Sequence, residues 1–341
     1  MARRASKGRL PKVRVPLATS TIVRMRPRYR WQLRSRALDL GPRTLIMGVV
    51  NVTPDSFSDG GRFFNPERAV QHALQLSDEG ADILDIGGES TRPGAQVVTG
   101  GFGAGVSAKP VVSEEEELRR VIPVIEGVRC ARPNAVISVD TYKSGVARAA
   151  VAAGAEIVND VSAFQWNPEM AGTCAELQCG VVLMHTRGQP HQWRGLSSEP
   201  DILARLEHEL ANHVQVAFEH GVQRERIVLD PGFGFGKNFE ENYPLLAHLD
   251  QLHRMGFPLL VGTSRKSFVG RTVGRLAGRD APPGERLYGS LAAMVASILR
   301  GAHVVRVHDV KPAVEAAAVA DEVLAAMTAA GGALSVTTQS M

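Results

Sequence analysis

The residues best suited to chemistry are polar side chains that directly follow short apolar runs. In chain order they are Asn51, Asp85 with Glu89 to Arg92, Asp140, Asn159 with Asp160, His185, Asp230, Ser264 to Ser267, and Arg306 with His308. A single aspartate in such a position is most often a helix cap. Eight successive runs with polar ends are instead typical of one shared site, because parallel strands present their carboxyl ends on one face.

One subset of these residues is suited to recognising a flat heterocycle. Carboxylates accept N–H pairs, an amide both donates and accepts, and an ammonium donates to carbonyl or imine acceptors. This combination fits an amino-oxo-pyrimidine edge, and buried polar edges are selective because a wrong ligand leaves them unpaired. The four residues are Asp140, Asn159, Asp230 and Lys266.

A second subset is suited to an anion. Arg306, His308 and Asn51 offer cationic or polar groups, and the turn at Ser264–Ser267 precedes a predicted helix. Cationic side chains and the N–H groups of a helix start bind phosphate or carboxylate. The glycine-rich DPGFGFGK at 230–237 is not a P-loop, because Pro231 and Asn238 replace the required Gly and Ser/Thr.

The elements that must position these groups alternate in type along the chain. Eight short apolar runs predict strands, and stretches with three- and four-residue apolar spacing predict helices between them. The strands are expected at 45–50, 83–86, 136–139, 157–158, 181–184, 227–229, 259–261 and 304–307. The helices are expected at 66–78, 114–126, 144–153, 202–220, 243–254, 285–300 and 312–328.

Eight strand and helix units predict an α/β fold of the closed (β/α)8 TIM-barrel type. An open doubly wound sheet is the alternative. Residues 29–44, which include a Gly-Pro turn, predict a short N-terminal hairpin leading into the barrel. The barrel domain is assigned to 31–335, with a glycine-rich insertion near 97–110 that predicts a surface loop.

The charge distribution separates a basic N-terminal tail from an acidic domain. Residues 1–38 carry twelve Lys and Arg and no acid, which leaves −8 for the remainder of a chain whose net charge is +4. We interpret residues 1–30 as a disordered extension; an organelle transit peptide and a nucleic-acid-binding arm are the alternatives. No apolar run is long enough to cross a membrane, and three cysteines without metal spacing favour a reducing, cytoplasmic setting.

Eight sequence blocks together resemble dihydropteroate synthases, a family of pterin-binding TIM barrels. The blocks are MGVVNVTPDSFSDGG (47–61), DIGGESTRPGA (85–95), SVDTYK (138–143), IVNDVSA (157–163), LMHTRG (183–188), LDPGFGFGKNFEENYPLL (229–246), LVGTSRKSFVG (260–270) and GAHVVRVHDV (301–310). The resemblance implies condensation of 6-hydroxymethyl-7,8-dihydropterin diphosphate with p-aminobenzoate. The products would be 7,8-dihydropteroate and pyrophosphate, with Mg2+ as cofactor, and the enzyme would be a homodimer.

The resemblance also implies roles for individual residues. The pterin ring would be bound by Asp140, Asn159, Met184, Asp230, Lys266 and Arg306. The diphosphate would be held by Asn51, Arg306 and His308, with Asn51 also near the metal. The p-aminobenzoate site would contain Thr91, Arg92, Pro93, Phe235 and Ser267. Catalysis would fall to Asp55, Asp59, Lys266, Arg306 and His308, with the two aspartates on the first loop facing positive charge that develops on the pterin.

Two features depart from the family pattern, and one other family shares the fold. The basic tail lies outside the pattern, and the insertion directly follows the expected p-aminobenzoate loop; we interpret it as a longer surface loop, the alternative being altered sulfonamide sensitivity. A methyltetrahydrofolate-binding domain of a methyltransferase would retain the pterin-binding Asp and Asn residues. It has no need of the NVTPDSFSDGG loop, of Ser264–Ser267, or of Arg306 with His308.

Overall fold

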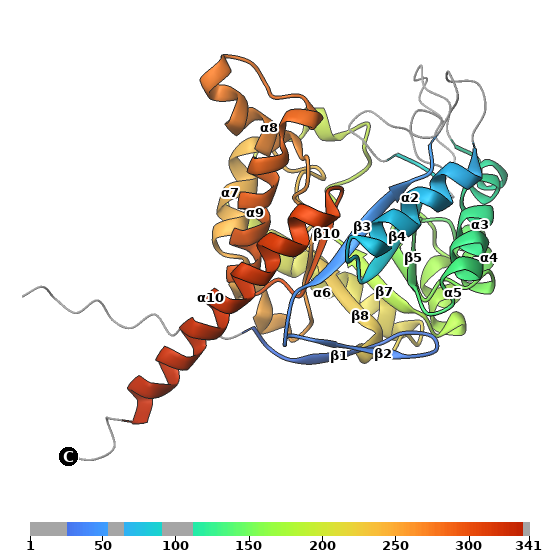
Figure 1. Ribbon diagram of the computed structural model, residues 1–341, viewed down its shortest axis with the longest axis horizontal. Helices are drawn as coiled ribbons and strands as arrows, with labels where there is room; N and C mark the ends of the chain where they lie inside the picture. Colours follow the sequence, from blue (N-terminus) through green and yellow to red (C-terminus); the bar gives the residue numbers. More distant parts are fainter. Residues whose placement is uncertain (1–25, 54–64, 91–111, 337–341) are drawn as a thin grey trace, which may run out of the picture.

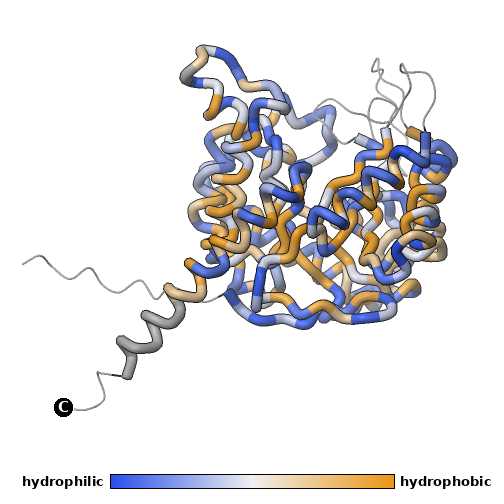
Figure 2. Tube along the Cα trace, viewed as in Figure 1, coloured by the Kyte–Doolittle hydropathy of each residue, from blue (hydrophilic) through white to orange (hydrophobic). Residues whose placement is uncertain are grey.

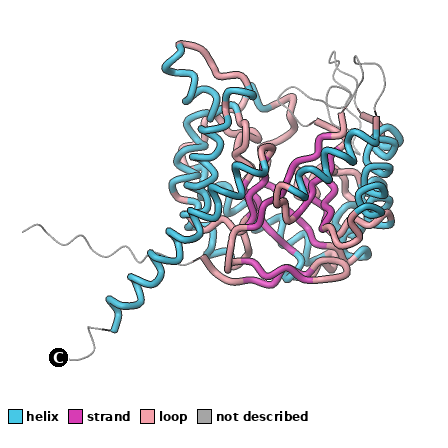
Figure 3. Tube along the Cα trace, viewed as in Figure 1, coloured by secondary structure: helices cyan, strands magenta, loops and turns pink. Residues whose placement is uncertain are grey.

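The computed structural model describes residues 26–53, 65–90 and 112–336 of the chain (Figure 1). Its centre is an eight-stranded parallel sheet surrounded by helices, as Figure 3 shows with strands in magenta and helices in cyan. The strands are β3 (Leu45–Asn51), β4 (Ile83–Gly87), β5 (Val136–Asp140), β6 (Ile157–Asp160), β7 (Gly180–Met184), β8 (Ile227–Asp230), β9 (Leu260–Val261) and β10 (Val304–Val307).

The sheet closes into a barrel. The strands follow the order β8-β7-β6-β5-β4-β3-β10-β9, every neighbouring pair is parallel, and an isolated parallel bridge between Leu229 and Leu259 joins the two edges. At this junction the Leu229 amide donates to the Pro258 carbonyl at 3.0 Å. The predicted (β/α)8 barrel is therefore confirmed, and the open doubly wound alternative is wrong.

The strands form at these positions because both of their faces are covered by apolar atoms. Inside the amino-terminal half of the barrel, Met47, Ile83, Ile157 and Val228 pack into one buried cluster. A larger cluster fills the layer between the strands and the outer helices. Figure 2 shows the result, with hydrophobic segments concentrated along the strands and on the inner sides of the helices.

A two-stranded antiparallel hairpin covers the amino-terminal end of the barrel (Figure 1). It consists of β1 (Tyr29–Gln32) and β2 (Ala37–Leu40), and it places Trp31, which is 1% exposed, in the same cluster as the strand residues. The Trp31 indole N–H donates to the Arg226 carbonyl at 2.8 Å. The predicted hairpin is confirmed. Its tip is formed by residues 33–36, however, and the Gly41-Pro42 turn follows β2.

Residues 26–30, the last part of the predicted N-terminal extension, lie against the barrel. Arg26 is buried, and its guanidinium donates to the carbonyls of Gly41 (3.1 Å) and Ala302 (3.1 Å), to Thr44 Oγ1 (2.7 Å) and to Asp321 Oδ1 (2.9 Å). These bonds hold Arg26 against the barrel. Residues 1–25 lie outside the described part of the chain.

The outer helices are α2 (Pro66–Asp78), α3 (Glu114–Ala131), α4 (Ser144–Ala152), α5 (Met170–Leu177), α6 (Ile202–Glu219), α7 (Phe239–Ala247), α8 (Ser267–Gly274), α9 (Leu287–Leu299) and α10 (Val310–Val336). The sequence did not predict α5. The helix expected at 243–254 is in fact α7, opened by a capping box of Asn238 and Glu241, followed by a 3₁₀ segment over Leu249–Met255. Within the described ranges, no helix has the length and apolarity needed to span a bilayer.

Candidate active site

The predicted site residues lie at the carboxyl ends of the strands, on the face opposite the hairpin. Asn51, Asp140, Met184 and Asp230 are the last residues of β3, β5, β7 and β8. Asn159 lies one residue before the end of β6, and Arg306 lies within β10. Lys266 is the residue that precedes α8, and Ser267 is the first residue of that helix.

Arg306 is held across the barrel interior by two carboxylates. Its Nε donates to Asp85 Oδ2 at 2.6 Å, and its Nη2 donates to Asp140 Oδ2 at 2.7 Å. The Asn159 side-chain amide also donates to Asp85 Oδ2, at 3.1 Å. The structure thus brings together Arg306, Asp140 and Asn159 as the sequence predicted, and it adds Asp85 as their common partner.

Asp85 is a residue of the site for which the sequence predicted no specific role. It is fully buried in the middle of the apolar strand β4. The signal that would have identified it is the charge itself, since a carboxylate inside a buried strand requires a cationic or hydrogen-bonding partner. Its second oxygen, Oδ1, is buried without a hydrogen-bond partner among the described residues.

Burial disfavours the charged forms of Asp140, Asp230 and Lys266, and the neighbouring charges and hydrogen bonds offset this effect only in part. Burial raises the pKa of Asp140 to about 7, against the opposing effect of Arg306 and with an added increase from Asp85. Burial likewise raises the pKa of Asp230 to about 6, although the Gly232 amide donates to its Oδ1 at 2.7 Å. A ligand with matching donors would relieve this cost by taking the place of the missing water.

Lys266 is affected in the opposite direction. Burial lowers its pKa to about 7, Arg306 lowers it further, and Asp230 and Asp140 act against both effects. Its ammonium lies 3.8 Å from the centre of the Phe235 ring, a cation–π contact. Lys266 therefore lies between an aromatic ring, two acids that favour its charged form and a guanidinium that opposes it.

An apolar wall stands beside the polar groups. Met184 is buried in a cluster with Tyr142, Val161 and Trp166, and Phe235 packs against this cluster. The rings of Tyr142 and Trp166 meet edge to face at 5.2 Å. A flat ligand whose edge pairs with the carboxylates would have an apolar surface for its ring face.

The groups expected to bind an anion lie around Ser264 and the start of α8. His308 Nδ1 lies 3.0 Å from Ser264 Oγ, which also accepts from the His308 backbone amide at 3.2 Å. Burial and the nearby Arg306 lower the pKa of His308 to about 3, so the imidazole is neutral near pH 7. The neutral ring can still donate or accept a hydrogen bond at this position. The N-cap residue Lys266 makes no side-chain hydrogen bond to the first turn of α8, so an anion can approach the N–H groups there.

Several predicted residues fall where the structure gives no description. Asp55 and Asp59 of the first loop, Thr91, Arg92 and Pro93 of the second, and the insertion near 97–110 all lie outside the described ranges. Their expected roles stay predictions.

The described residues of the site offer few ligands for Mg2+. Across the described ranges no three His, Cys, Asp or Glu side chains group as a metal cage. Asn51 is half-buried at the end of β3 and offers one amide oxygen. Because Mg2+ typically retains water and takes substrate phosphates with only one or two protein oxygens, this sparse set fits an ion that arrives with a diphosphate.

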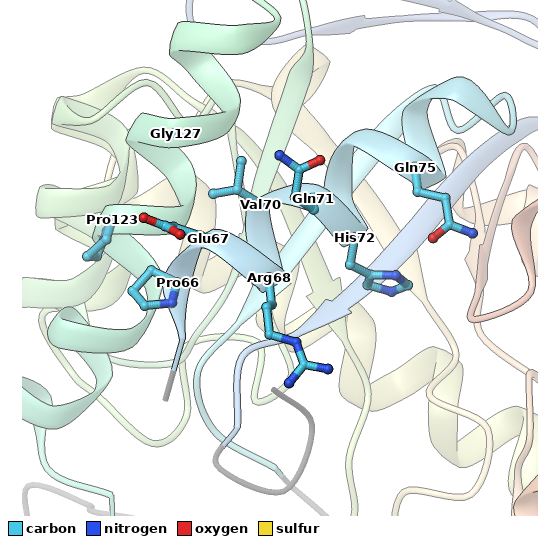
Figure 4. Close-up of a pocket in the computed structure, with 9 residues that line it drawn as sticks. All are labelled: Pro66, Glu67, Arg68, Val70, Gln71, His72, Gln75, Pro123 and Gly127. Carbon is cyan, nitrogen blue, oxygen red and sulfur yellow. The ribbon is translucent and has the colours of Figure 1, made fainter. Parts of the chain in front are cut away.

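A large depression on the described surface lies elsewhere. It has a volume of about 940 Å3 and lies between α2 and α3 (Figure 4). Its lining includes Glu67, Arg68, His72 and Gln75 of α2 with Pro123 of α3, and none of the candidate site residues. This depression is a gap between two outer helices. The barrel mouth instead contains polar side chains that converge and have shifted pKa values, which is what indicates a functional site.

Comparison with known proteins agrees with the arrangement at the barrel mouth. The family described as pterin binding enzyme matches residues 47–308. The dihydropteroate synthase of Escherichia coli K12 is 43% identical over 281 residues, which cover 82% of this chain and 92% of that protein.

Two solved structures of the Xanthomonas albilineans dihydropteroate synthase are similar in fold. The one with 4-aminobenzoic acid has a TM-score of 0.74 and 44% identity, covering 87% of this chain and 98% of that one. The one in complex with 7,8-dihydropteroate has a TM-score of 0.71 and 43% identity, covering 86% and 98%. This chain belongs to the dihydropteroate synthase family of pterin-binding enzymes.

Proposed function

We propose that the protein condenses 6-hydroxymethyl-7,8-dihydropterin diphosphate with p-aminobenzoate to give 7,8-dihydropteroate and pyrophosphate. It is a transferase of folate synthesis. The observation that carries the proposal is the Arg306 cluster at the barrel mouth, in which the guanidinium donates to Asp85 and Asp140 and the Asn159 amide donates to Asp85. Lys266 and Asp230 lie beside it, each with a pKa displaced by burial.

The pterin binds to the polar edge of this cluster. Asp140 and Asp230 accept from ring and exocyclic N–H groups, Asn159 supplies one donor and one acceptor, and Lys266 donates to the ring carbonyl or imine. Met184 packs against one part of the ring, and Arg306 covers its face. Acceptance requires ionised carboxylates, so binding strengthens as the pH rises through the raised pKa of Asp140, about 7.

The reaction proceeds through departure of the leaving group first. The C–O bond to the diphosphate breaks, and its electron pair leaves with pyrophosphate. The arylamine nitrogen then attacks the resonance-stabilised cation with its lone pair and afterwards loses a proton to solvent. An arylamine is already neutral at pH 7, so no strong general base is needed. Arg306, with the donors at His308 and Asn51, stabilises the charge that accumulates on the leaving oxygens.

Mg2+ is proposed as the cofactor, held by Asn51 together with diphosphate oxygens. When bound it supplies Lewis-acid stabilisation of the departing diphosphate. Asp55 and Asp59 are proposed to face the positive charge on the pterin.

The p-aminobenzoate is proposed to bind between Thr91, Arg92 and Pro93 on one side and Phe235 with Ser267 on the other. Ser267 is exposed at the first position of α8, where the helix N-terminus favours a carboxylate. The Phe235 ring, already in contact with the Lys266 ammonium, supplies an apolar face for the arylamine ring.

A homodimer in a reducing cytoplasm is proposed as the working state. Large apolar side chains are exposed on α9 and α10, with Tyr288 at 83%, Val319 at 66% and Val323 at 44%. Exposed apolar groups on neighbouring helices are typical of an interface. Cys130, Cys174 and Cys179 are free thiols. The proposed reaction needs no partner beyond the second subunit and the two small substrates. We do not assign nucleic-acid binding to the basic tail.

The deciding experiment measures pyrophosphate release by the purified protein with Mg2+ and the pterin diphosphate, with and without p-aminobenzoate. Release that depends on p-aminobenzoate, with formation of dihydropteroate, supports the proposal. Absence of release in both cases refutes it. Tight binding of methyltetrahydrofolate without any release would favour the methyltransferase-type alternative.

A further inference from the structure

Lys237 is a buried cation that the proposed reaction does not use. It is 7% exposed, and it ends the glycine-rich loop that joins β8 to α7. Its ammonium donates to three backbone carbonyls, those of Gly232 (2.8 Å), Phe235 (3.3 Å) and His185 (3.3 Å). Two of the acceptors belong to the loop itself, and the third belongs to the neighbouring loop after β7.

The loop around this ammonium has an unusual backbone shape. Gly232, Gly234 and Gly236 all have positive φ angles, 65°, 78° and 65°. A Cβ at Gly232 would lie 2.0 Å from the His185 carbonyl oxygen, and one at Gly236 would lie 2.8 Å from that of Arg187. The backbone therefore packs directly on the β7 loop and turns its carbonyls inward, where they need a donor.

Lys237 matches that need in number and in charge. An ammonium has three N–H donors and the loop offers three carbonyl acceptors, so each donor has a partner. Burial lowers the pKa of Lys237 to about 7, while Asp230 and Glu241 oppose the shift and Lys266 and Arg187 add to it. A buried ammonium is costly, and these hydrogen bonds with the two acids are what compensate for it.

The residue that the loop presents to the site is Phe235. Its own carbonyl is one of the three acceptors of Lys237, and its ring contacts the Lys266 ammonium at 3.8 Å. The ring also meets the Trp193 ring edge to face at 5.3 Å. Phe233, two residues earlier, is fully buried and faces Phe268 instead. The alternation leaves Phe235 as the one aromatic ring of this loop at the barrel mouth.

We propose that Lys237 is a positioning residue that fixes Phe235 in place and thereby sets the affinity for the arylamine substrate, with a smaller effect on pterin recognition. The proposal rests on the proposed function, because it takes Phe235 as part of the arylamine site. Three residues of the pterin set are held elsewhere: Asp85 on β4 accepts from Arg306 and Asn159, and Arg306 donates to Asp140. Of the others, Asp230 and Lys266 adjoin the loop, since Asp230 accepts from the Gly232 amide and Lys266 contacts Phe235.

The test compares Lys237→Met and Lys237→Gln with wild type in steady-state kinetics. The KM for p-aminobenzoate should rise about tenfold in Lys237→Met, the factor that ~1.4 kcal/mol represents. The rise should be smaller in Lys237→Gln, which retains two donors. The KM for the pterin diphosphate should rise less than that for p-aminobenzoate, because Asp140, Asn159 and Arg306 keep their mutual contacts and those with Asp85.

Arg226→Met is the matched control. Arg226 is also a buried cation on backbone carbonyls, those of Leu33 and Gln178, but it lies at the hairpin end of the barrel. Its loss should lower the melting temperature and change neither KM. A double-mutant cycle with Phe235→Leu gives a further readout, because replacing Lys237 should add no further rise in the p-aminobenzoate KM once Phe235 is gone.

Three results would overturn the proposal. They are an unchanged p-aminobenzoate KM in a folded Lys237 variant, equal rises in both KM values, and additive effects in the cycle. Failure of both Lys237 variants to fold would also overturn it, since Lys237 would then serve stability alone. Wild-type protein without synthase activity would instead refute the proposed function, which keeps the two failures distinct.

Discussion

Replacing Asp85 by Asn tests whether the buried carboxylate organises the site. Asp85 Oδ2 accepts from Arg306 Nε at 2.6 Å and from the Asn159 amide at 3.1 Å. The substitution retains the shape and removes the charge. A hydrogen bond between charged groups contributes about 1.5–3 kcal/mol and a neutral one about 1 kcal/mol. The bond that aligns Arg306 should therefore weaken by about 1–2 kcal/mol. That loss corresponds to a decrease of about 5- to 30-fold in kcat/KM for the pterin diphosphate.

The pH profile provides an independent check on the same variant. The charge on Asp85 raises the pKa of Asp140, and Arg306 lowers it. Without the Asp85 charge, Arg306 is left with Asp140 as its nearest anion, and both changes lower the pKa of Asp140. The acid limb of kcat/KM for the pterin diphosphate should therefore move to lower pH. The assay is pyrophosphate release at saturating p-aminobenzoate between about pH 5 and about pH 9, a range that brackets the limb on both sides.

Asp82→Asn is the matched control at the opposite end of the barrel. Asp82 pairs with Arg43 and accepts from the Ile46 amide, but the Arg43 side chain is 59% exposed. Loss of an exposed pair should cost less than about 1 kcal/mol of stability and leave kcat/KM unchanged. The reasoning fails if Asp85→Asn retains kcat/KM within about threefold of wild type, or if its acid limb moves to higher pH.

Three further outcomes are expected. Deleting residues 1–25 should leave unfolding in urea and synthase activity unchanged, whereas Arg26→Ala should cost about 3 kcal/mol, because Asp321 loses its buried partner; equal stability of the two variants would contradict this. The unfolding free energy of the ligand-free protein should fall as pH rises from about 4 to 7, since Asp140 and Asp230 have raised pKa values of about 7 and about 6 and hold protons that the unfolded chain has released. Asp140→Asn should flatten that slope in urea titrations at stepped pH, and an unchanged slope would assign it to other groups. Asp59→Ala should lower kcat far more than the affinity for the pterin, and equal losses in the two would remove the role proposed for the first loop.

The barrel was predictable from the sequence because its strands are covered on both faces. Each apolar run, such as 304–307, ends at a polar residue that leaves the core, so the observed strands differ from the expected ones by two residues at most. The convergence of Asp140, Asn159 and Arg306 followed from the same rule. Closure of the sheet fixes where strand ends meet, and the polar residue types fix what they offer.

The misses have local physical causes. Asp85 is one of the polar residues that the sequence pattern assigns to the strand ends, but its partner Arg306 is 221 residues away in sequence, so only the folded chain reveals the pair. Helix α5 is eight residues long and buries Met170, Ala171, Thr173 and Cys174, so its sequence lacks the contrast between faces that marks a helix. Arg26 belongs by composition to the basic tail, and only its four acceptors distinguish it.

The thin junction between β8 and β9 has a consequence for how substrate and fold depend on each other. Strand β9 has two residues, and the single bridge between Leu229 and Leu259 joins its edge to β8. Asp230 ends β8 and Lys266 follows β9, so a pterin that pairs with both spans this seam. A substrate bound across the seam would stabilise the closed barrel. By linkage, any change that opens the seam would weaken substrate binding. Slower amide hydrogen exchange at Leu229 on pterin binding would show this stabilisation of the seam by the substrate.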